Sequence, residues 1–146
     1  MISWHRLAHR LHLAKIPLVP KLLYILNRIL FGIVLPPSVR LGKDVLLGYQ
    51  GLGTVIHART IIGDRVNIGP GVTIGGRSGM YDVPIIEADV ILGAGCKILG
   101  PIKVGRGALI GANAVVIGDV PAFATAVGVP ARIIPRSDQD TFTVET

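Results

Sequence analysis

The chain has 146 residues, half of them hydrophobic and only 5% aromatic, which suits one domain with a core of Ile, Val, Leu and Ala. Its formal net charge is +6. Residues 1–43 hold seven Lys or Arg and no acid, whereas the remainder holds eight basic residues and nine acids. Because nucleic-acid binding requires a basic stripe across the folded domain, we expect no nucleic-acid partner.

Residues 1–34 predict a basic helical arm. Within it, residues 2–16 are typical of an amphipathic helix, because Trp4, Leu7 and Leu11 share one face while histidine and arginine fill the rest. The arm therefore has an apolar side that needs a partner.

Pro17 and Pro20 are expected to end this first helix, and a second apolar segment follows at residues 22–35. That segment is interrupted by Asn27 and Arg28 and is too short to span a bilayer. No small-residue cleavage site follows it, so it does not resemble a signal peptide.

The arm has two interpretations. It packs on its own coils or on a neighbouring subunit, or its Trp4, leucines and basic residues lie on an anionic membrane surface. His5, His9 and His12 have no carboxylate or cysteine nearby in the sequence, so we predict no metal site.

Residues 35–134 repeat with a period of six. Early hexads begin at Leu35, Leu41 and Leu47. A period of six fits neither a helix nor a plain half-buried strand, so it indicates a repeat architecture. In the later hexads a small or branched residue follows four positions after the leading aliphatic, and glycine often follows it directly. The leading aliphatics of these hexads are Ile56, Ile62, Ile68, Ile74, Ile86, Leu92, Ile98, Val104, Ile110 and Val116.

Stacked hexads would lay these aliphatics in continuous interior columns, three hexads to a coil, as a parallel β-helix. The glycines are expected at corners whose backbone angles oppose a side chain. Cys96 falls in an inward position and is expected to act as a small core hydrophobe. A lone cysteine offers no disulfide framework and is consistent with a reducing cytoplasm.

Two interruptions break the repeat. The step from Leu47 to Ile56 is nine residues, and His57 follows in a position that is often glycine. Broken local rules without a packing gain indicate function. Residues 75–84 are Gly-rich and polar, which predicts a projecting loop that walls a cleft. Residues 135–146 form a polar tail that we expect to be disordered.

Several motifs carry a resemblance to a known family. They are Thr73-Ile74-Gly75-Gly76, Leu92-Gly93-Ala94-Gly95, Lys97-Ile98-Leu99-Gly100, Ile110-Gly111-Ala112-Asn113-Ala114-Val115-Val116 and Gly128-Val129-Pro130-Ala131-Arg132. Together they resemble the hexapeptide-repeat acyltransferases, specifically the C-terminal domain of serine acetyltransferases. The chain is still more similar to short serine-acetyltransferase-like proteins associated with capsule and exopolysaccharide biosynthesis. The likeness covers residues 35–134.

The resemblance implies a left-handed coil and a homotrimer with active sites between subunits. It also implies acetyl-CoA as cosubstrate, with the pantetheine arm running along the coil edge. By position, the backbone at Gly76, Ala94 and Ala112 would contact that arm, and Arg132 would bind CoA phosphate.

The chain departs from this family at its catalytic positions. The family's catalytic His falls on Tyr49 when the nine-residue step is counted as one extra residue, and its partner Asp falls on Val34. A second family His falls near Val83. A short arm also replaces the large N-terminal helical domain of the full-length serine enzymes.

His57 is the one histidine in the repeat domain, so it is the histidine available as general base. Tyr49 is a candidate for binding the acceptor or assisting proton transfer, and Asp82 for orienting the base or binding substrate. A backbone N–H of a Gly-rich turn would stabilise the oxyanion.

The sequence therefore predicts an acetyl-CoA-dependent O-acetyltransferase without a metal. The acceptor is L-serine or a sugar hydroxyl of a polysaccharide precursor, and the arm favours the sugar because lipid-linked sugars lie at membranes. We expect a cytoplasmic protein, at the inner face of the membrane if the arm binds lipid. The alternative is a non-catalytic trimeric scaffold. A γ-class carbonic anhydrase would need several histidine ligands in the coils and is disfavoured.

Overall fold

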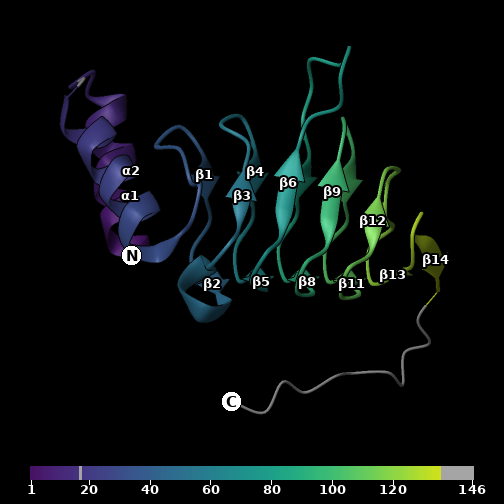
Figure 1. Ribbon diagram of the computed structural model, residues 1–146. Coiled ribbons are helices and arrows are strands. Elements are labelled where there is room, and N and C mark those ends of the chain that lie inside the picture. Colours follow the sequence, from purple (N-terminus) through teal and green to yellow (C-terminus); the bar gives the residue numbers. More distant parts are fainter. Residues whose placement is uncertain (17, 136–146) are drawn as a thin grey trace.

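The computed structural model describes residues 1–16 and 18–135. Two helices, α1 (Ile2–Leu13) and α2 (Leu18–Phe31), stand at one end of a β-solenoid whose coils stack along a single axis (Figure 1). Pro17 and, apart from Pro135, the predicted tail lie outside the described residues. Neither helix combines the length and the apolar character that crossing a membrane requires.

The solenoid has three sheets, and each coil passes through them in the same order. All strand pairs are parallel except β13 with β14, which are antiparallel. Sheet 1 contains β1 (Arg40–Leu41), β4 (Ile61–Ile62), β7 (Ile85–Ile86) and β10 (Lys103–Val104). Sheet 2 contains β2 (Leu46–Leu47), β5 (Asn67–Ile68), β8 (Ile91–Leu92), β11 (Leu109–Ile110), β13 (Thr125–Val127) and β14 (Arg132–Ile134). Sheet 3 contains β3 (Val55–Ile56), β6 (Thr73–Gly75), β9 (Lys97–Leu99) and β12 (Val115–Val116).

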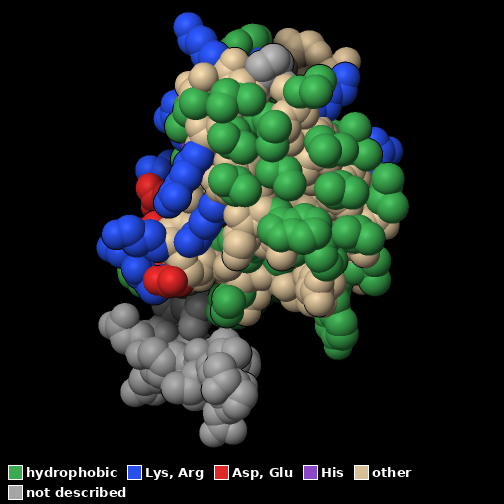
Figure 2. Space-filling model, turned by 90° about the vertical axis from the view of Figure 1, so that its left-hand side faces the viewer, with side chains coloured by type: hydrophobic (Ala, Val, Ile, Leu, Met, Phe, Trp, Pro, Cys, Tyr) green, Lys and Arg blue, Asp and Glu red, His purple; other side chains and the backbone are tan. Residues whose placement is uncertain are grey.

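The helices cap the first coil through polar contacts as well as packing. His5 is buried and its Nε2 lies 3.2 Å from the carbonyl oxygen of Val39, while Nδ1 of His9 lies 2.7 Å from that of Pro37. Because a carbonyl only accepts, both rings donate. The arm thus packs on its own coils, and the opposite side of the helices faces outward with many hydrophobic side chains (Figure 2).

Pro20 does not end a helix, contrary to the expectation. It lies in the first turn of α2, where it is buried. A proline is tolerated there because the first N–H groups of a helix have no intrahelical acceptor.

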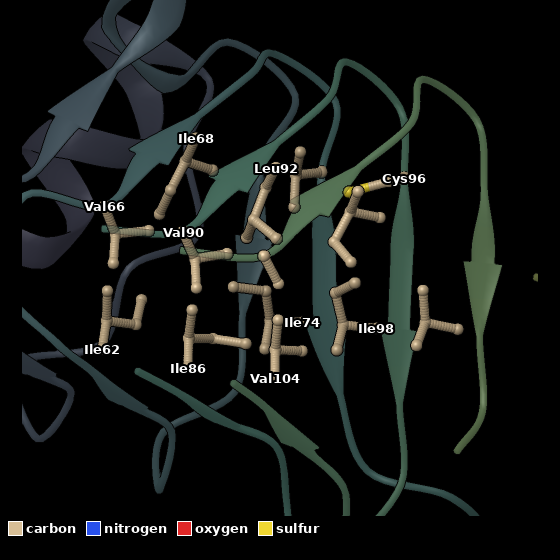
Figure 3. Packing of buried hydrophobic residues seen from close by; sticks show 14 of the residues in the cluster. Ile62, Val66, Ile68, Ile74, Ile86, Val90, Leu92, Cys96, Ile98 and Val104 are labelled. Atoms are coloured by element: carbon tan, nitrogen blue, oxygen red, sulfur yellow. The ribbon is translucent and has the colours of Figure 1, made fainter. Parts of the chain in front are cut away.

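The predicted aliphatic columns form the core. Register places Ile62 beside Ile86 and Val104 in sheet 1, and Ile74 beside Ile98 in sheet 3, with their side chains pointing into the coil (Figure 3). These side chains are almost completely buried. Cys96 lies among them, and burial raises the pKa of its thiol to about 12, so it is neither a nucleophile nor a ligand near neutral pH.

Most of the glycines that follow the leading aliphatics are required for a different reason from the one predicted; Gly75, where a Cβ would make only ordinary contacts, is an exception. At Gly93 the backbone φ is not positive, but an added Cβ would lie 2.6 Å from the backbone nitrogen of Ala112 in the next coil. Close approach of coils therefore excludes a side chain. Left-handed backbone angles occur two residues later in the turn, as at Gly95 and Asn113.

We predict that acid weakens the docking of α1 through His5. Burial is the main cause that lowers the pKa of His5 to about 4, with His9 and Arg6 contributing in the same direction. Between the folded pKa and the ordinary histidine pKa of 6.5, the unfolded chain binds more protons than the folded chain, so stability falls as pH falls through this window. The loss from pH 7 to pH 4 is about 3 kcal/mol.

Urea unfolding at both pH values checks this. His5→Gln should reduce the pH dependence, whereas His12→Gln, at an exposed position of the same helix, should leave it as in the wild type. Equal pH dependence in all three proteins would contradict the assignment.

Candidate active site

His57 lies at the corner between sheets 3 and 1, directly after β3. Its backbone N–H donates to the carbonyl of Ile74 in the next coil, at 2.8 Å. The same corner of that next coil carries the loop of residues 76–84, which has no helix or strand and projects from the solenoid as predicted (Figure 1). Stacking of coils therefore brings His57 and this loop to one edge.

The His57 ring has a defined hydrogen-bonding role. Its Nδ1 lies 3.2 Å from the backbone nitrogen of Arg59, whose N–H is the donor. Nδ1 is therefore unprotonated, and in the neutral ring the proton is on Nε2. Among the described residues, no carboxylate forms a hydrogen bond or ion pair with this ring.

A groove of about 390 Å³ runs along the outer face of sheet 1 beside the loop. Its polar lining comes from four side chains, those of Arg59, Asp82, Lys103 and Asp119, and its aromatic lining from Tyr81. Hydrophobic residues of β4 and β7 form the floor. Asp82 thus lies in a groove, as a substrate-binding role requires, whereas His57 does not line it.

Arg59 holds the loop against the coil. Its guanidinium carbon lies 3.8 Å from the centroid of the Tyr81 ring, and its Nη2 donates to the Tyr81 carbonyl oxygen. A cation over an aromatic face contributes roughly 0.5–2 kcal/mol. One side chain therefore links the His57 corner to the wall of the groove.

The far side of the groove carries charges that are already paired. Lys103 Nζ lies 2.6 Å from Glu87 Oε1, and the Lys103 backbone N–H donates to Asp119 Oδ1 at 2.8 Å. The hydrogen bond to Lys103 lowers the pKa of Glu87 and raises that of Lys103 in turn. An acceptor molecule would therefore meet a groove of nearly balanced charge.

Tyr49 lies elsewhere. It belongs to the short 3-10 segment Gly48–Gly51 between sheets 2 and 3, where Tyr49 and Gln50 adopt left-handed backbone angles. The Tyr49 side chain is 83% exposed and lines a second groove together with Ile29 and Leu30 of α2. Within one chain, Tyr49 and Asp82 are thus on different corners of the solenoid.

Three of the four predicted cofactor residues follow one edge of the solenoid, between sheets 2 and 3. Asn113 N–H donates to the Ala94 carbonyl at 2.9 Å, which stacks the Ala94 and Ala112 turns. Val127 lies over Gly111, and Arg132 pairs with Val127 in β14, so Arg132 continues the same edge. This arrangement can present turn backbone and one guanidinium to an extended ligand.

Gly76 is at the opposite edge of sheet 3, where the projecting loop begins. The backbone N–H groups of Ala94 and Ala112, at the edge between sheets 2 and 3, donate to no other described backbone group. A ligand contacting Gly76, Ala94 and Ala112 would have to cross sheet 3.

Within residues 1–16 and 18–135, no group of three His, Cys, Asp or Glu is placed to hold a metal ion.

Sequence reasoning missed Arg59, Tyr81, Lys103 and Asp119 as groove residues. They come from three different coils, and an arginine over an aromatic ring leaves no pattern along the chain. The one available signal was position, because Arg59 and the loop occupy equivalent corners in successive coils.

We predict that Arg59→Ala loosens the loop of residues 76–84 without unfolding the coil. Loss of the stacking and of the bond to the Tyr81 carbonyl should raise hydrogen exchange at the loop amides by about tenfold. Arg59→Lys keeps a cation, so its hydrogen-exchange rate at the loop amides should lie between those of the wild type and Arg59→Ala. Hydrogen-exchange mass spectrometry checks this, and loop protection equal to the wild type in Arg59→Ala would contradict it.

Comparisons with known proteins place this architecture in a family. The family described as bacterial transferase hexapeptide (six repeats) matches residues 84–118. The chain is 43% identical over 136 residues to the serine acetyltransferase of Synechococcus elongatus, covering 91% of this chain and 55% of that protein. It is 40% identical over 134 residues to that of Helicobacter pylori, covering 90% and 78%.

Solved structures agree. Serine acetyltransferase of Neisseria gonorrhoeae superposes with a TM-score of 0.87 at 37% identity, over 93% of this chain and 54% of that one. The soybean enzyme complexed with serine gives 0.86 at 37% identity, over 91% and 55%. The chain spans 55% and 62% of the length of the Synechococcus and Bacillus subtilis relatives. The predicted left-handed β-helix of hexapeptide repeats is confirmed, and the chain belongs to the serine acetyltransferase family of hexapeptide-repeat transferases.

Proposed function

We propose that this protein is an acetyl-CoA-dependent O-acetyltransferase acting on a small hydroxyl acceptor. The observation that carries the proposal is structural likeness to serine acetyltransferases along more than nine-tenths of the chain. The edge of stacked turns at Ala94 and Ala112, ending at Arg132, supports it, because free turn N–H groups and a guanidinium suit pantetheine amides and phosphate.

The reaction is a direct transfer. The acceptor oxygen attacks the thioester carbonyl, its proton passes to a base, and the new C–O bond replaces the C–S bond as CoA leaves. The leaving thiolate then takes a proton, so no covalent enzyme intermediate is required. We assign the base to His57, since it lies at the edge where the loop and the groove begin.

The geometry of His57 sets a condition on this role. Its free nitrogen, Nε2, carries the proton in the neutral ring, while the lone pair of Nδ1 is engaged by the Arg59 N–H. Proton transfer therefore requires Nδ1 to exchange the Arg59 N–H for the acceptor hydroxyl. A long bond of 3.2 Å is a weak competitor for a well-placed hydroxyl.

We further infer a homotrimer with sites between subunits. Tyr49 and Asp82 lie on different corners of one solenoid, so a site that uses both needs a second copy. Ile61 and Ile85, which form the floor of the groove on sheet 1, and Val55 on sheet 3 are partly exposed and would be covered by a neighbour.

The acceptor is L-serine or a sugar hydroxyl. Two relatives have structures in complex with serine, which supports serine. The exposed Tyr81 ring and the carboxylates of Asp82 and Asp119 in the groove support a polyhydroxylated acceptor, since carboxylates accept hydroxyl hydrogen bonds. A single buried thiol and no disulfide support a cytoplasmic location.

The alternative is a non-catalytic trimeric scaffold. It is favoured by one observation, that the described residues supply no carboxylate to orient His57 while its Nδ1 is already occupied. A scaffold of this kind would bind its partners through the same edge and groove without turnover.

We predict that His57→Gln lowers acetyl transfer by about two to four orders of magnitude, the usual contribution of a general base. Release of the CoA thiol from acetyl-CoA is measured with L-serine and with a panel of sugars. His12→Gln, at an exposed position of α1, is the matched control and should keep wild-type turnover.

Turnover that survives His57→Gln would contradict the assignment of His57 as the base but not the proposed acetyl transfer. Acetyl-CoA binding without acceptor-dependent release, for serine and for every sugar tested, would favour the scaffold. Absence of acetyl-CoA binding by calorimetry would overturn the proposed acetyl transfer.

A further inference from the structure

The exposed side of α2 is strongly hydrophobic, while the helix buries a polar side chain. The fully buried positions of this helix are Pro20 and Asn27, and Asn27 is 1% exposed. Both polar atoms of the Asn27 amide lack a hydrogen-bond partner among the described residues. Leu23, Leu26 and Phe31 are half-buried, but the remaining large aliphatic side chains of α2 face outward, where a surface helix of a globular domain is normally polar.

The hydrophobic residues of α2 form a continuous outward surface, which we call the cap face. It consists of Leu18, Leu22, Ile25, Ile29 and Leu30, joined by Leu52 of the following connection. Leu18, Ile29 and Leu52 are 78%, 72% and 60% exposed. The spacing of Leu18, Leu22, Ile25 and Ile29 keeps them within about 60° of one another around the helix, and Leu30 lies about 100° beyond Ile29. Figure 2 looks onto this end of the molecule, and hydrophobic side chains lie side by side across much of it.

The cap face has basic margins and no acid. Lys21 and Arg28 are exposed and lie roughly 80° around α2 from the stripe, a position from which a long side chain can reach a charged layer above it. Residues 1–43 contain no Asp or Glu. Figure 2 likewise shows Lys and Arg at the edges of the hydrophobic area.

Charge decides between the occupants of such a surface. Two copies meeting cap to cap would bring their basic side chains together without a carboxylate to pair them. An anionic bilayer offers both an apolar interior for the leucines and negative headgroups for Lys21 and Arg28.

We infer that the cap face lies on the surface of an anionic lipid bilayer, with the apolar side chains of α2 in the headgroup boundary and the solenoid axis directed away from the membrane. The inference does not rest on the proposed acetyl transfer, because lipid binding requires neither acetyl-CoA nor an acceptor. If the acceptor is a sugar carried on a lipid, the cap would bring the groove close to it.

Vesicle flotation of the full chain tests the inference. We expect binding to phosphatidylcholine vesicles that contain about one third phosphatidylglycerol, weakened by salt and much weaker on pure phosphatidylcholine. Leu22→Ser/Ile29→Ser should lower the partition coefficient by roughly tenfold or more, because it removes two exposed apolar side chains. Ile117→Ser, an exposed apolar site in the last coils, is the matched control and should bind as the wild type does.

A second variant separates lipid binding from folding. Lys21→Glu/Arg28→Glu changes only exposed side chains and should abolish the preference for anionic vesicles while thermal unfolding stays unchanged. Equal binding of wild type and both double variants would overturn the inference. So would absence of vesicle binding together with an assembly, measured by light scattering, that becomes smaller in Leu22→Ser/Ile29→Ser, since the occupant would then be a second copy.

Discussion

The hydrogen bonds between successive coils are the constraint on which the rest of this structure depends. Each short strand pairs in register with the strand one coil later, so the backbone of a turn lies against the backbone of the next turn. Aliphatic columns fill the small interior that remains, and no side chain fits at the closest corners such as Gly93. Residues that point into the coil must therefore be apolar and small enough to fit, and side chains of other kinds are accommodated at the corners and ends.

Corners are where this chain carries its chemistry. His57 and the loop of residues 76–84 occupy the same corner of successive coils, and Arg59 joins them by contacting Tyr81. The Ala94 and Ala112 turns occupy another corner column, which Arg132 extends. A solenoid thus aligns functional groups along edges, and a site that needs two edges must use a second subunit or a ligand that crosses a sheet.

The helical end is held to the solenoid by side chains, unlike the coils, which are joined by backbone hydrogen bonds. α1 is bonded to the first coil through His5 and His9, so its orientation is fixed by donors that point at two backbone carbonyls. With α1 in that place, α2 turns Asn27 inward and Leu18, Leu22 and Leu30 outward. The helical end of the solenoid therefore has an exposed apolar surface, next to a groove lined by Tyr49.

The six-residue period was enough to identify the columns, the number of hexads per coil and the inward position of Cys96, because each follows from a local pattern repeated along the chain. The projecting loop was predicted from the Gly-rich, polar composition of residues 75–84, which interrupts that pattern. The first helix of the arm was also predicted from its apolar spacing, whereas the second was identified only as an apolar segment. Contacts between coils could not be predicted in this way, since Arg59 and Tyr81 are 22 residues apart and meet only when the coils stack. Three further features were decided by the tertiary structure. Close approach of successive coils requires glycine at corners such as Gly93, Tyr49 and Asp82 lie on different corners, and the apolar stripe of α2 faces outward. Each depends on which backbone lies opposite, and a period along one chain carries no information about that.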